Sequence, residues 1–332
     1  MDLIEKFKEQ AKKELKKIVL PEGEDDRILS SAAEIAKEKI AIPAVIGEPN
    51  SIKERAAKLS LNLSGVTIID PVSSPKLDSY AKAYMSKRPD VSEGMAKRLV
   101  KKNLFFGAMM VSTGDADGMV AGAANATATI IQVSVLAIGF QKGISTPSSF
   151  FIMVVPEALG EKDKTLLYSD CAVNIDPNAE ALADIAMASA MSTKEVLGME
   201  PRVAMLSFST KGSASHPNVD KVLAALKIVK EKMPNLMVDG EFQADTALVA
   251  AVAAKKVKEK SDVAGKANTL IFPDLQSGNI SYKLTQYLAN AKAYGPILQG
   301  FSKPVSDLSR GASVKDIVGV AAIMAVKAQK KG

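Results

Sequence analysis

The chain of 332 residues has no tryptophan, one cysteine and one histidine, and aromatic residues make up only 5% of it. The single cysteine, Cys171, excludes a disulfide framework within the chain and is typical of a reducing compartment, so we expect a cytoplasmic protein. One histidine and one cysteine leave only scattered carboxylates as metal ligands, and we predict no metal site. With so few aromatic side chains on which bases can stack, we expect no nucleic-acid partner.

Long apolar runs are also missing. The longest, such as residues 150–155, fall far short of the roughly 20 residues that span a bilayer, and the N-terminal stretch carries charges but no apolar signal core. We therefore expect no association with membranes. Segment 114–123 has glycines four positions apart instead of the spacing of a dinucleotide-binding turn, which argues against a nicotinamide enzyme.

Positive charge is in modest excess, with a net charge of +6. Such a surplus suits a polyanionic ligand. Much of it lies, however, in the lysine-rich runs 6–17 and 327–331, which we predict to be solvated helix faces.

Short β-rich runs alternate with helical patterns, which indicates parallel sheets covered by helices on both faces. The predicted strands are 17–22, 41–47, 66–70, 150–156, 166–170, 202–209, 236–240 and 269–274. The predicted helices, in which apolar residues recur near helical spacing, are 80–88, 95–102, 179–198, 219–233 and 245–260. With 332 residues, 47% of them hydrophobic, the chain exceeds the length at which one core usually divides, so we expect two domains.

The segment GPILQGFSKPVSDLSRGAS at 295–313 is followed by Asp316, which places three reactive side chains within eight positions. Ser309 offers a hydroxyl donor, and Arg310 offers a planar fork that matches phosphate or a developing oxyanion. Asp316 can take a proton from an attacking thiol. The competing interpretation is a turn followed by a capped surface helix.

A second polar loop follows the predicted strand 202–209. Its hydroxyls, lysine and glycine suit a nest for an oxyanion or phosphate, although the loop lacks the spacing of a Walker sequence and also reads as a helix N-cap. The candidate residues are Ser207, Ser209, Thr210, Lys211, Gly212 and Ser213. His216, at the following helix start, is given no role. Ser309 has no histidine partner and an acid beside Cys171 raises a thiol pKa, so covalent catalysis has little support.

Polar residues end other predicted strands. PEGEDDR at 21–27 presents four acids and Arg27. The favourable interaction of acids with the dipole at a helix start explains the four acids. Because strand carboxyl ends build ligand sites in α/β sheets, we expect further polar residues to shape such a site or to form structural hydrogen bonds. These are Asp239, Glu241, Gln243, Asp245, Gln276, Ser277 and Asn279.

Taken together and in this order, these segments resemble the phosphate acetyltransferases of the phosphate acetyl/butyryltransferase family over nearly the whole chain. Besides the closing segment, the matching motifs are PEGEDDR, GDADGMVAGA at 114–123, DCAVNIDP at 170–177, RVAMLSFSTKGSASHP at 202–217, VDGEFQADTALV at 238–249 and GKANTLIFPDLQSGNISYKL at 265–284. The resemblance implies an α/β fold like that of isocitrate and isopropylmalate dehydrogenases. It consists of two three-layer α/β/α domains with mostly parallel sheets, an active-site cleft between them, and a homodimer. Domain 1 is expected to comprise 1–145 and 298–332, and domain 2 to comprise 146–297.

The resemblance also implies an activity, namely reversible transfer of acetyl between coenzyme A and phosphate in a ternary complex. No cofactor is expected, because coenzyme A is itself a substrate. Asp316 is expected to deprotonate its thiol, and Ser309 and Arg310 to stabilise the oxyanion and the departing phosphate. Arg27, Asn279 and the 207–213 loop are expected to bind the acyl phosphate.

The chain departs from the family pattern after GDADGMVAGA. A histidine, an acid, an arginine and a proline of the family are matched by Asn125, Thr129, Gln132 and Val133, and the lost arginine is one that holds coenzyme A. Glutamine supplies neither its charge nor its fork. We expect Gln132 to remain at the coenzyme A site and Lys87, Arg88 or Lys142 to hold the phosphates. Two alternatives stay open: transfer of butyryl or another short acyl group, and a paralogue that binds acyl-CoA without turnover.

Overall fold

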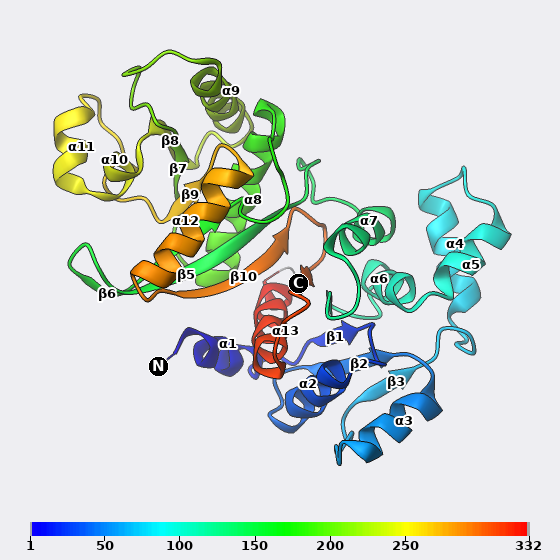
Figure 1. Cartoon of the computed structure of the whole chain (residues 1–332). Coiled ribbons are helices and arrows are strands. Elements are labelled where there is room, and N and C mark those ends of the chain that lie inside the picture. Colours follow the sequence, from blue (N-terminus) through cyan, green and yellow to red (C-terminus); the bar gives the residue numbers. More distant parts are fainter. Residues whose placement is uncertain (1, 331–332) are drawn as a thin grey trace. The chain divides into compact units, whose positions relative to one another are not determined.

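In the computed structural model, which describes residues 2–330, the chain folds into two compact α/β units. Of the described residues, 2–139 and 301–330 belong to unit 1, and 140–300 belong to unit 2. The sequence placed these divisions at 145/146 and 297/298. The chain thus leaves unit 1 once and returns to it for the C-terminal segment (Figure 1).

Unit 1 is built on a five-stranded sheet in the order β11-β4-β1-β2-β3, in which every pairing is parallel. The strands are β1 (Lys17–Leu20), β2 (Ile42–Ile46), β3 (Thr67–Ile69), β4 (Gly118–Ala121) and β11 (Val305–Asp307). The helices are α1 (Leu3–Ala11), α2 (Asp26–Lys37), α3 (Pro49–Lys58), α4 (Leu77–Lys87), α5 (Glu93–Val100), α6 (Asn103–Thr113), α7 (Thr127–Ala137) and α13 (Val314–Gln329). Helices α2 and α13 pack on the sheet with α1 against α13, whereas α6 packs on the sheet and against α4, α5 and α7.

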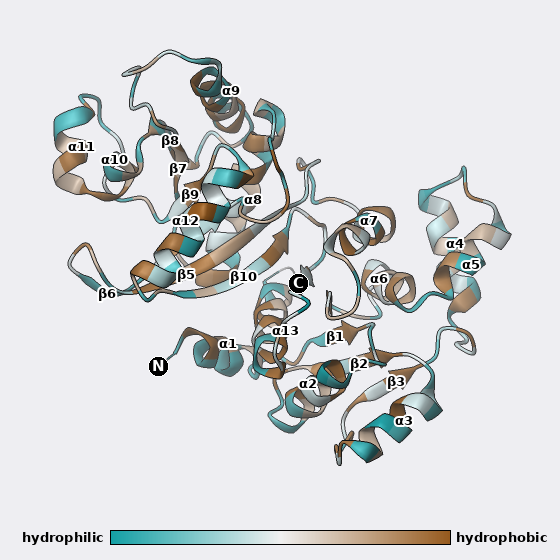
Figure 2. Cartoon of the chain, in the orientation of Figure 1, coloured by the Kyte–Doolittle hydropathy of each residue, from teal (hydrophilic) through white to brown (hydrophobic). Residues whose placement is uncertain are grey.

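Helix α6 is buried on all sides, which its sequence LFFGAMMV explains. Every residue from Leu104 to Val111 is buried, so this helix has no polar face and lies between the sheet and other helices (Figure 2). Gly107 permits the close packing on β1, because a Cβ at this position would lie 2.9 Å from Cγ1 of Val19.

Unit 2 is built on a six-stranded sheet in the order β10-β5-β6-β9-β7-β8. The strands are β5 (Ser148–Ala158), β6 (Glu161–Ser169), β7 (Arg202–Leu206), β8 (Met237–Phe242), β9 (Thr269–Ile271) and β10 (Lys292–Gln299). Its helices are α8 (Ala179–Leu197), α9 (Pro217–Lys232), α10 (Ala244–Leu248), α11 (Ala250–Lys256) and α12 (Leu275–Leu288). Strand β5 is antiparallel to both β6 and β10, and the other pairings are parallel.

Two apolar clusters in unit 2 match the two faces of this sheet. One joins α8 and α9 to the strands, and the other joins α10 and α12 to the strands (Figure 2). The three-layer arrangement therefore follows from strands that bury side chains on both faces. Among the described residues, no helix is both long enough and apolar enough to cross a bilayer.

The predicted elements were confirmed in type, except that one predicted helix is divided and that Lys327 and Lys8, predicted to be solvated, are buried. Segment 245–260 forms two helices, because Val249 is extended, with φ −108° and ψ 109°. The run 327–331 was predicted to be solvated, yet Lys327 is only 4% exposed within α13, and residue 331 lies outside the described part of the chain. In run 6–17, Lys8 is 8% exposed and its ammonium lies 3.2 Å from Glu38.

Candidate active site

The three predicted catalytic residues lie together in unit 1, on the loop that follows β11 and on the first turn of α13. Ser309, Arg310 and Asp316 are all exposed. The Ser309 hydroxyl oxygen accepts the amide N–H of Gly311 at 3.3 Å. The guanidinium of Arg310 makes no hydrogen bond or ion pair to another residue of the described chain, so it is available to an anion.

Asp316 belongs to a capping box at the start of α13. Its Oδ2 accepts the Ser313 amide at 2.9 Å and the Ser313 hydroxyl at 2.7 Å, and the Ser313 oxygen accepts the Asp316 amide. This reciprocal pair fixes the carboxylate at the helix start. The segment therefore fits both interpretations of the sequence, the capped surface helix and the set of reactive side chains, because the cap presents an exposed carboxylate. Within the described chain, Oδ1 of Asp316 accepts no hydrogen bond.

Arg27 was expected to bind acyl phosphate, and the structure gives its side chain other partners. It forms a two-point pair with Asp25, at 3.0 and 2.7 Å. It also donates to the carbonyls of Ala123, Arg310 and Ala312 at 2.8, 2.6 and 3.2 Å. A direct phosphate contact would require one of these bonds to break.

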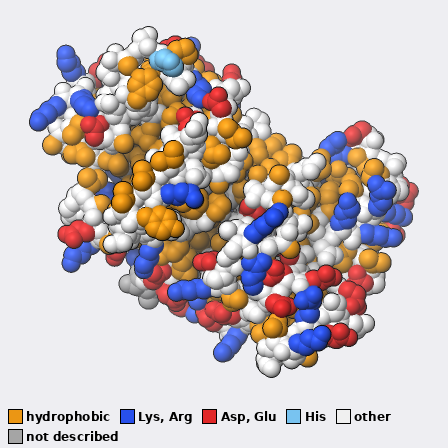
Figure 3. All heavy atoms as spheres, in the orientation of Figure 1, with side chains coloured by type: hydrophobic (Ala, Val, Ile, Leu, Met, Phe, Trp, Pro, Cys, Tyr) orange, Lys and Arg blue, Asp and Glu red, His pale blue; other side chains and the backbone are white. Residues whose placement is uncertain are grey.

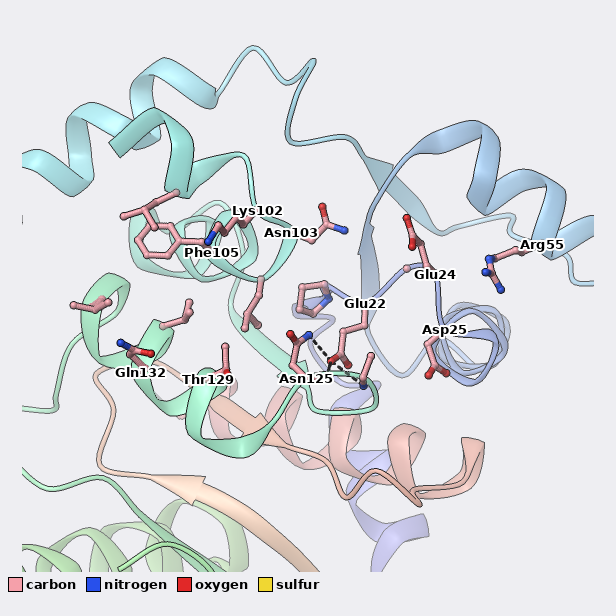
Figure 4. Close-up of a pocket in the computed structure, with 17 residues that line it drawn as sticks. Glu22, Glu24, Asp25, Arg55, Lys102, Asn103, Phe105, Asn125, Thr129 and Gln132 are labelled. Carbon is pink, nitrogen blue, oxygen red and sulfur yellow. Dashed lines mark hydrogen bonds between the residues drawn. The ribbon is translucent and has the colours of Figure 1, made fainter. Parts of the chain in front are cut away.

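A pocket of about 810 Å³ opens in unit 1 beside the segment where the chain departs from the family pattern (Figure 4). It extends from Gln132 on α7 to Arg55 on α3, and Lys102 at the start of α6 is its second cation. Its apolar wall is formed by Leu99, Leu104, Phe105, Val133 and Leu136. The remaining lining residues are Pro21, Glu22, Gly23, Glu24, Asp25, Asn103, Ala124, Asn125 and Thr129.

Lys87 and Arg88, which were expected to hold the coenzyme A phosphates, do not line this pocket. The Lys87 ammonium donates to the Ser112 hydroxyl at 2.5 Å and the Ala137 carbonyl at 3.1 Å, and burial lowers its pKa. Arg88 pairs with Asp90 through two bonds, at 3.1 and 2.9 Å. Both cations are already neutralised or satisfied by the chain itself. Lys142, the third candidate, also lies outside the pocket lining.

Glu22 organises the floor of the pocket, a role that the sequence did not reveal. Its buried carboxylate accepts four successive amides, those of residues 122–125, at 2.8 to 3.1 Å. The Asn125 side-chain amide adds a fifth bond at 2.8 Å (Figure 4). The helix dipole, proposed for all four acids of 21–27, is therefore wrong for Glu22, which fixes the loop that leads into α7.

Asp307 is a second buried carboxylate that the sequence did not reveal. It ends β11, two residues before Ser309, and is 3% exposed. Its Oδ2 accepts the Thr127 hydroxyl at 2.5 Å, and its Oδ1 has no partner among the described residues. Burial raises the pKa of Asp307 to about 6, and the charge of Glu22 acts in the same direction.

In unit 2, the predicted phosphate nest at 207–213 is closed by the chain's own acceptors. The buried Glu241 carboxylate accepts the Ser209 hydroxyl and the Gly212 amide, both at 2.8 Å. The amides of residues 209–214 all donate to acceptors within the unit. The Lys211 ammonium lies 2.7 Å from Asp239 and 2.9 Å from the Gly240 carbonyl. The backbone amides of residues 209–214 thus have partners within the unit, and contact of this loop with acyl phosphate stays a prediction.

The other predicted ligand of unit 2, Asn279, lies on α12 and donates to the carbonyl of Cys171 at 3.1 Å. Cys171 is buried, and burial followed by the charge of Asp170 raises the pKa of its thiol, as the sequence suggested. Asp170 itself accepts the amides of residues 172–174 and fixes this loop.

The fold and these loops define an α/β protein of two units whose polar residues gather at the carboxyl ends of parallel strands, a feature typical of enzymes. The family model described as Phosphate acetyl/butaryl transferase matches residues 2–325. The chain belongs to this family.

Individual relatives agree. The phosphate acetyltransferase of Thermoanaerobacterium thermosaccharolyticum is 50% identical over 99% of this chain and 100% of its own length. A phosphotransacetylase structure from Streptococcus pyogenes is 40% identical, with a TM-score of 0.91 over 98% of each chain. The 4-hydroxythreonine-4-phosphate dehydrogenase of Klebsiella pneumoniae, at 13% identity, has a TM-score of 0.56 over 95% of this chain and 100% of its own, which shows the fold alone. The predicted fold class is confirmed.

Proposed function

We propose that this chain is an acyltransferase that moves acetyl reversibly between phosphate and coenzyme A. The observation that carries this proposal is the exposed set Ser309, Arg310 and Asp316 on one loop and helix start of a family member. A protein that only bound the substrates would have no use for a fixed, accessible proton acceptor.

The reaction proceeds by direct attack in a ternary complex. Asp316 takes the proton of the coenzyme A thiol, and the thiolate attacks the acetyl carbonyl of acetyl phosphate. The C–S bond forms, the oxyanion is stabilised by Ser309 and Arg310, and the C–O bond to phosphate then breaks. Phosphate leaves with the electron pair of that bond, and no covalent enzyme intermediate is needed.

We propose that the unit 1 pocket binds coenzyme A, with Lys102 in place of the arginine that the chain lacks. Arg55, which also pairs with Asp26 at 3.1 Å, is the other cation. Coenzyme A combines phosphates with apolar ring and chain portions, which suits a pocket lined by two cations and an apolar wall. The first residues of α6 also line the pocket, and this helix has neither an acid in its first turn nor a side-chain cap. Its dipole therefore favours an anion there.

The test of the function is thioester formation from coenzyme A with acetyl phosphate and with butyryl phosphate in parallel, followed by the ultraviolet absorbance of the thioester. We expect saturable turnover that favours acetyl phosphate. A preference for butyryl phosphate would reassign the acyl group. No turnover with either substrate, from protein shown to be folded, would instead support a non-catalytic binder.

We also propose a homodimer in the cytoplasm. Helix α12 exposes a stripe of four large apolar residues, which are 53–80% exposed: Ile280, Leu284, Tyr287 and Leu288. Their spacing puts them on one helix face, and Figure 3 shows hydrophobic side chains on the surface over α12. A single buried cysteine and coenzyme A as a substrate support the cytoplasmic location.

A further inference from the structure

The side chain of Arg27 uses every hydrogen-bond donor that it has. A guanidinium group carries five N–H donors. Two of them meet the Asp25 carboxylate, and three meet the backbone carbonyls of Ala123, Arg310 and Ala312. Because all five N–H groups donate to the chain itself, none remains for a ligand. The guanidinium therefore stabilises the protein structure.

These bonds join segments that are far apart in the sequence. Arg27 is in the first turn of α2, whereas Arg310 and Ala312 follow it by 283 and 285 positions and flank Gly311. The third carbonyl, that of Ala123, belongs to the loop whose amides Glu22 holds from the other side. Arg27 thus fixes the backbone of the loop that carries Ser309 and Arg310.

Asp25 holds the guanidinium in this orientation. It is the N-cap of α2, and its Oδ1 accepts the amide of Arg27 at 2.9 Å as well as the side-chain Nε. The pair is mostly shielded, with side-chain exposures of 33% for Arg27 and 17% for Asp25. Hydrogen bonding from Arg27 lowers the pKa of Asp25, so the pair stays ionised at neutral pH.

The loop has little else to fix its backbone. Within residues 309–312, the amides of Gly311 and Ala312 donate only to the Ser309 hydroxyl and carbonyl, at 3.3 and 2.9 Å. These are local bonds that would move with the loop. The Arg310 side chain has no partner within the described chain, so its starting position depends on the backbone that Arg27 holds.

We propose that Arg27, oriented by Asp25, is a positioning residue that sets the Ser309–Arg310 loop for acyl transfer and acts through backbone carbonyls, without binding the acyl phosphate. This proposal rests on the proposed function, because the position of the loop matters only if Ser309 and Arg310 take part in acyl transfer. Misplacing reacting groups by about 1 Å can cost about 100-fold in rate, so a loosened loop lowers kcat.

The experiment compares Arg27→Gln, Arg27→Lys and Asp25→Asn, with the exposed Arg98→Gln on α5 as the matched control. We expect Arg27→Gln to lower kcat by about 10- to 100-fold, with KM for acetyl phosphate and for coenzyme A within about twofold of the wild type. Arg27→Lys, which can reach one carbonyl, should recover part of kcat, and Asp25→Asn should lower kcat less than Arg27→Gln. Arg98→Gln should match the wild type.

Amide hydrogen exchange supplies a readout that does not depend on activity. Exchange within residues 308–313 should accelerate in Arg27→Gln, while the strands of unit 1 exchange as in the wild type. If the wild type has no turnover but the loop still loosens, the function has failed and the hold by Arg27 stands. A rise of about tenfold in KM for acetyl phosphate with unchanged kcat, or unchanged exchange in the loop, would overturn the proposal.

Discussion

Buried carboxylates of this chain do the work that a bound anion does in many α/β proteins. Glu22 collects the four amides of residues 122–125, and Glu241 collects a hydroxyl and an amide from the 207–213 loop. In each case the carboxylate is a permanent acceptor for donors that a bound anion would otherwise accept. The loops beside the strand ends are therefore fixed before any substrate arrives.

For Glu241, structural hydrogen bonding was one of the two expectations from the sequence, and it is confirmed. Glu22 was not assigned this role, for a physical reason. The partners of Glu22 lie about 100 positions away and meet it only because β4 pairs with β1. One signal was present: GAANA at 122–126 offers small residues and few side-chain acceptors, so its amides need an acceptor from elsewhere. For Arg27, the sequence indicated a site residue, but three of its four partners, the carbonyls of Ala123, Arg310 and Ala312, meet it only through tertiary structure.

Asp307→Asn tests the consequence of the raised pKa of Asp307. The pKa is about 6 in the folded protein against an ordinary value of 3.8. The folded state therefore binds the proton more tightly, and ionisation destabilises it as the pH rises from about 4 to about 6. A shift of about two pKa units corresponds to about 3 kcal/mol above that window.

Asparagine cannot ionise, so the variant escapes this loss. We expect the stability of Asp307→Asn relative to the wild type to increase by about 2–3 kcal/mol between pH 4 and pH 7, measured by urea unfolding at several pH values. A difference between the two proteins that does not change with pH would show that Asp307 titrates normally.

For two helical segments, the periodicity of the sequence did not predict the helix boundaries or the exposed residues. The pattern over 245–260 favours one helix, but the carbonyls of Thr246 and Ala247 accept the amides of Gly265 and Ala267. These carbonyls would otherwise serve the next turn, so the helix breaks at Val249. Likewise, the lysines after 326 suggested a solvated face, but α13 packs against α1, α2 and the sheet, and this covers Lys327.

The pocket between α3, α6 and α7 is tested by removing its cations one at a time. Replacing Lys102 or Arg55 by Gln removes a charge that faces bound phosphate, and we expect KM for coenzyme A to rise about tenfold with little change in kcat. Lys58→Gln, on the exposed side of α3, is the matched control. If Arg88→Gln raises KM for coenzyme A and Lys102→Gln does not, the original assignment of Arg88 is right and the pocket assignment is wrong.

At the scale of the whole molecule, composition and strand–helix rhythm predicted two domains with layered sheets, and family resemblance supplied the discontinuity. Pattern alone could not show that the chain re-enters unit 1. Strand β11 has only three residues, and it is recognised as a strand only because it pairs with β4. The antiparallel position of β5 was likewise invisible, since its apolar run fits a strand of either direction.

The proposed homodimer is tested by placing charge on the α12 stripe. Leu284→Glu combined with Leu288→Glu would bury two carboxylates in each copy of a symmetric interface, which is strongly unfavourable. We expect sedimentation velocity to show a wild-type dimer and a folded, monomeric double variant. Val72→Glu, at an exposed apolar residue of unit 1, should remain dimeric. A double variant that sediments as the wild type does would remove α12 from the interface.

The most direct test of acetyl transfer by the 309–316 segment is the turnover of Arg310→Ala beside the wild type, with coenzyme A and acetyl phosphate both saturating. We predict that the variant stays folded and loses on the order of 3–4 kcal/mol of transition-state stabilisation, about 100- to 1,000-fold in kcat. Near-normal turnover by Arg310→Ala would contradict the role assigned to this loop.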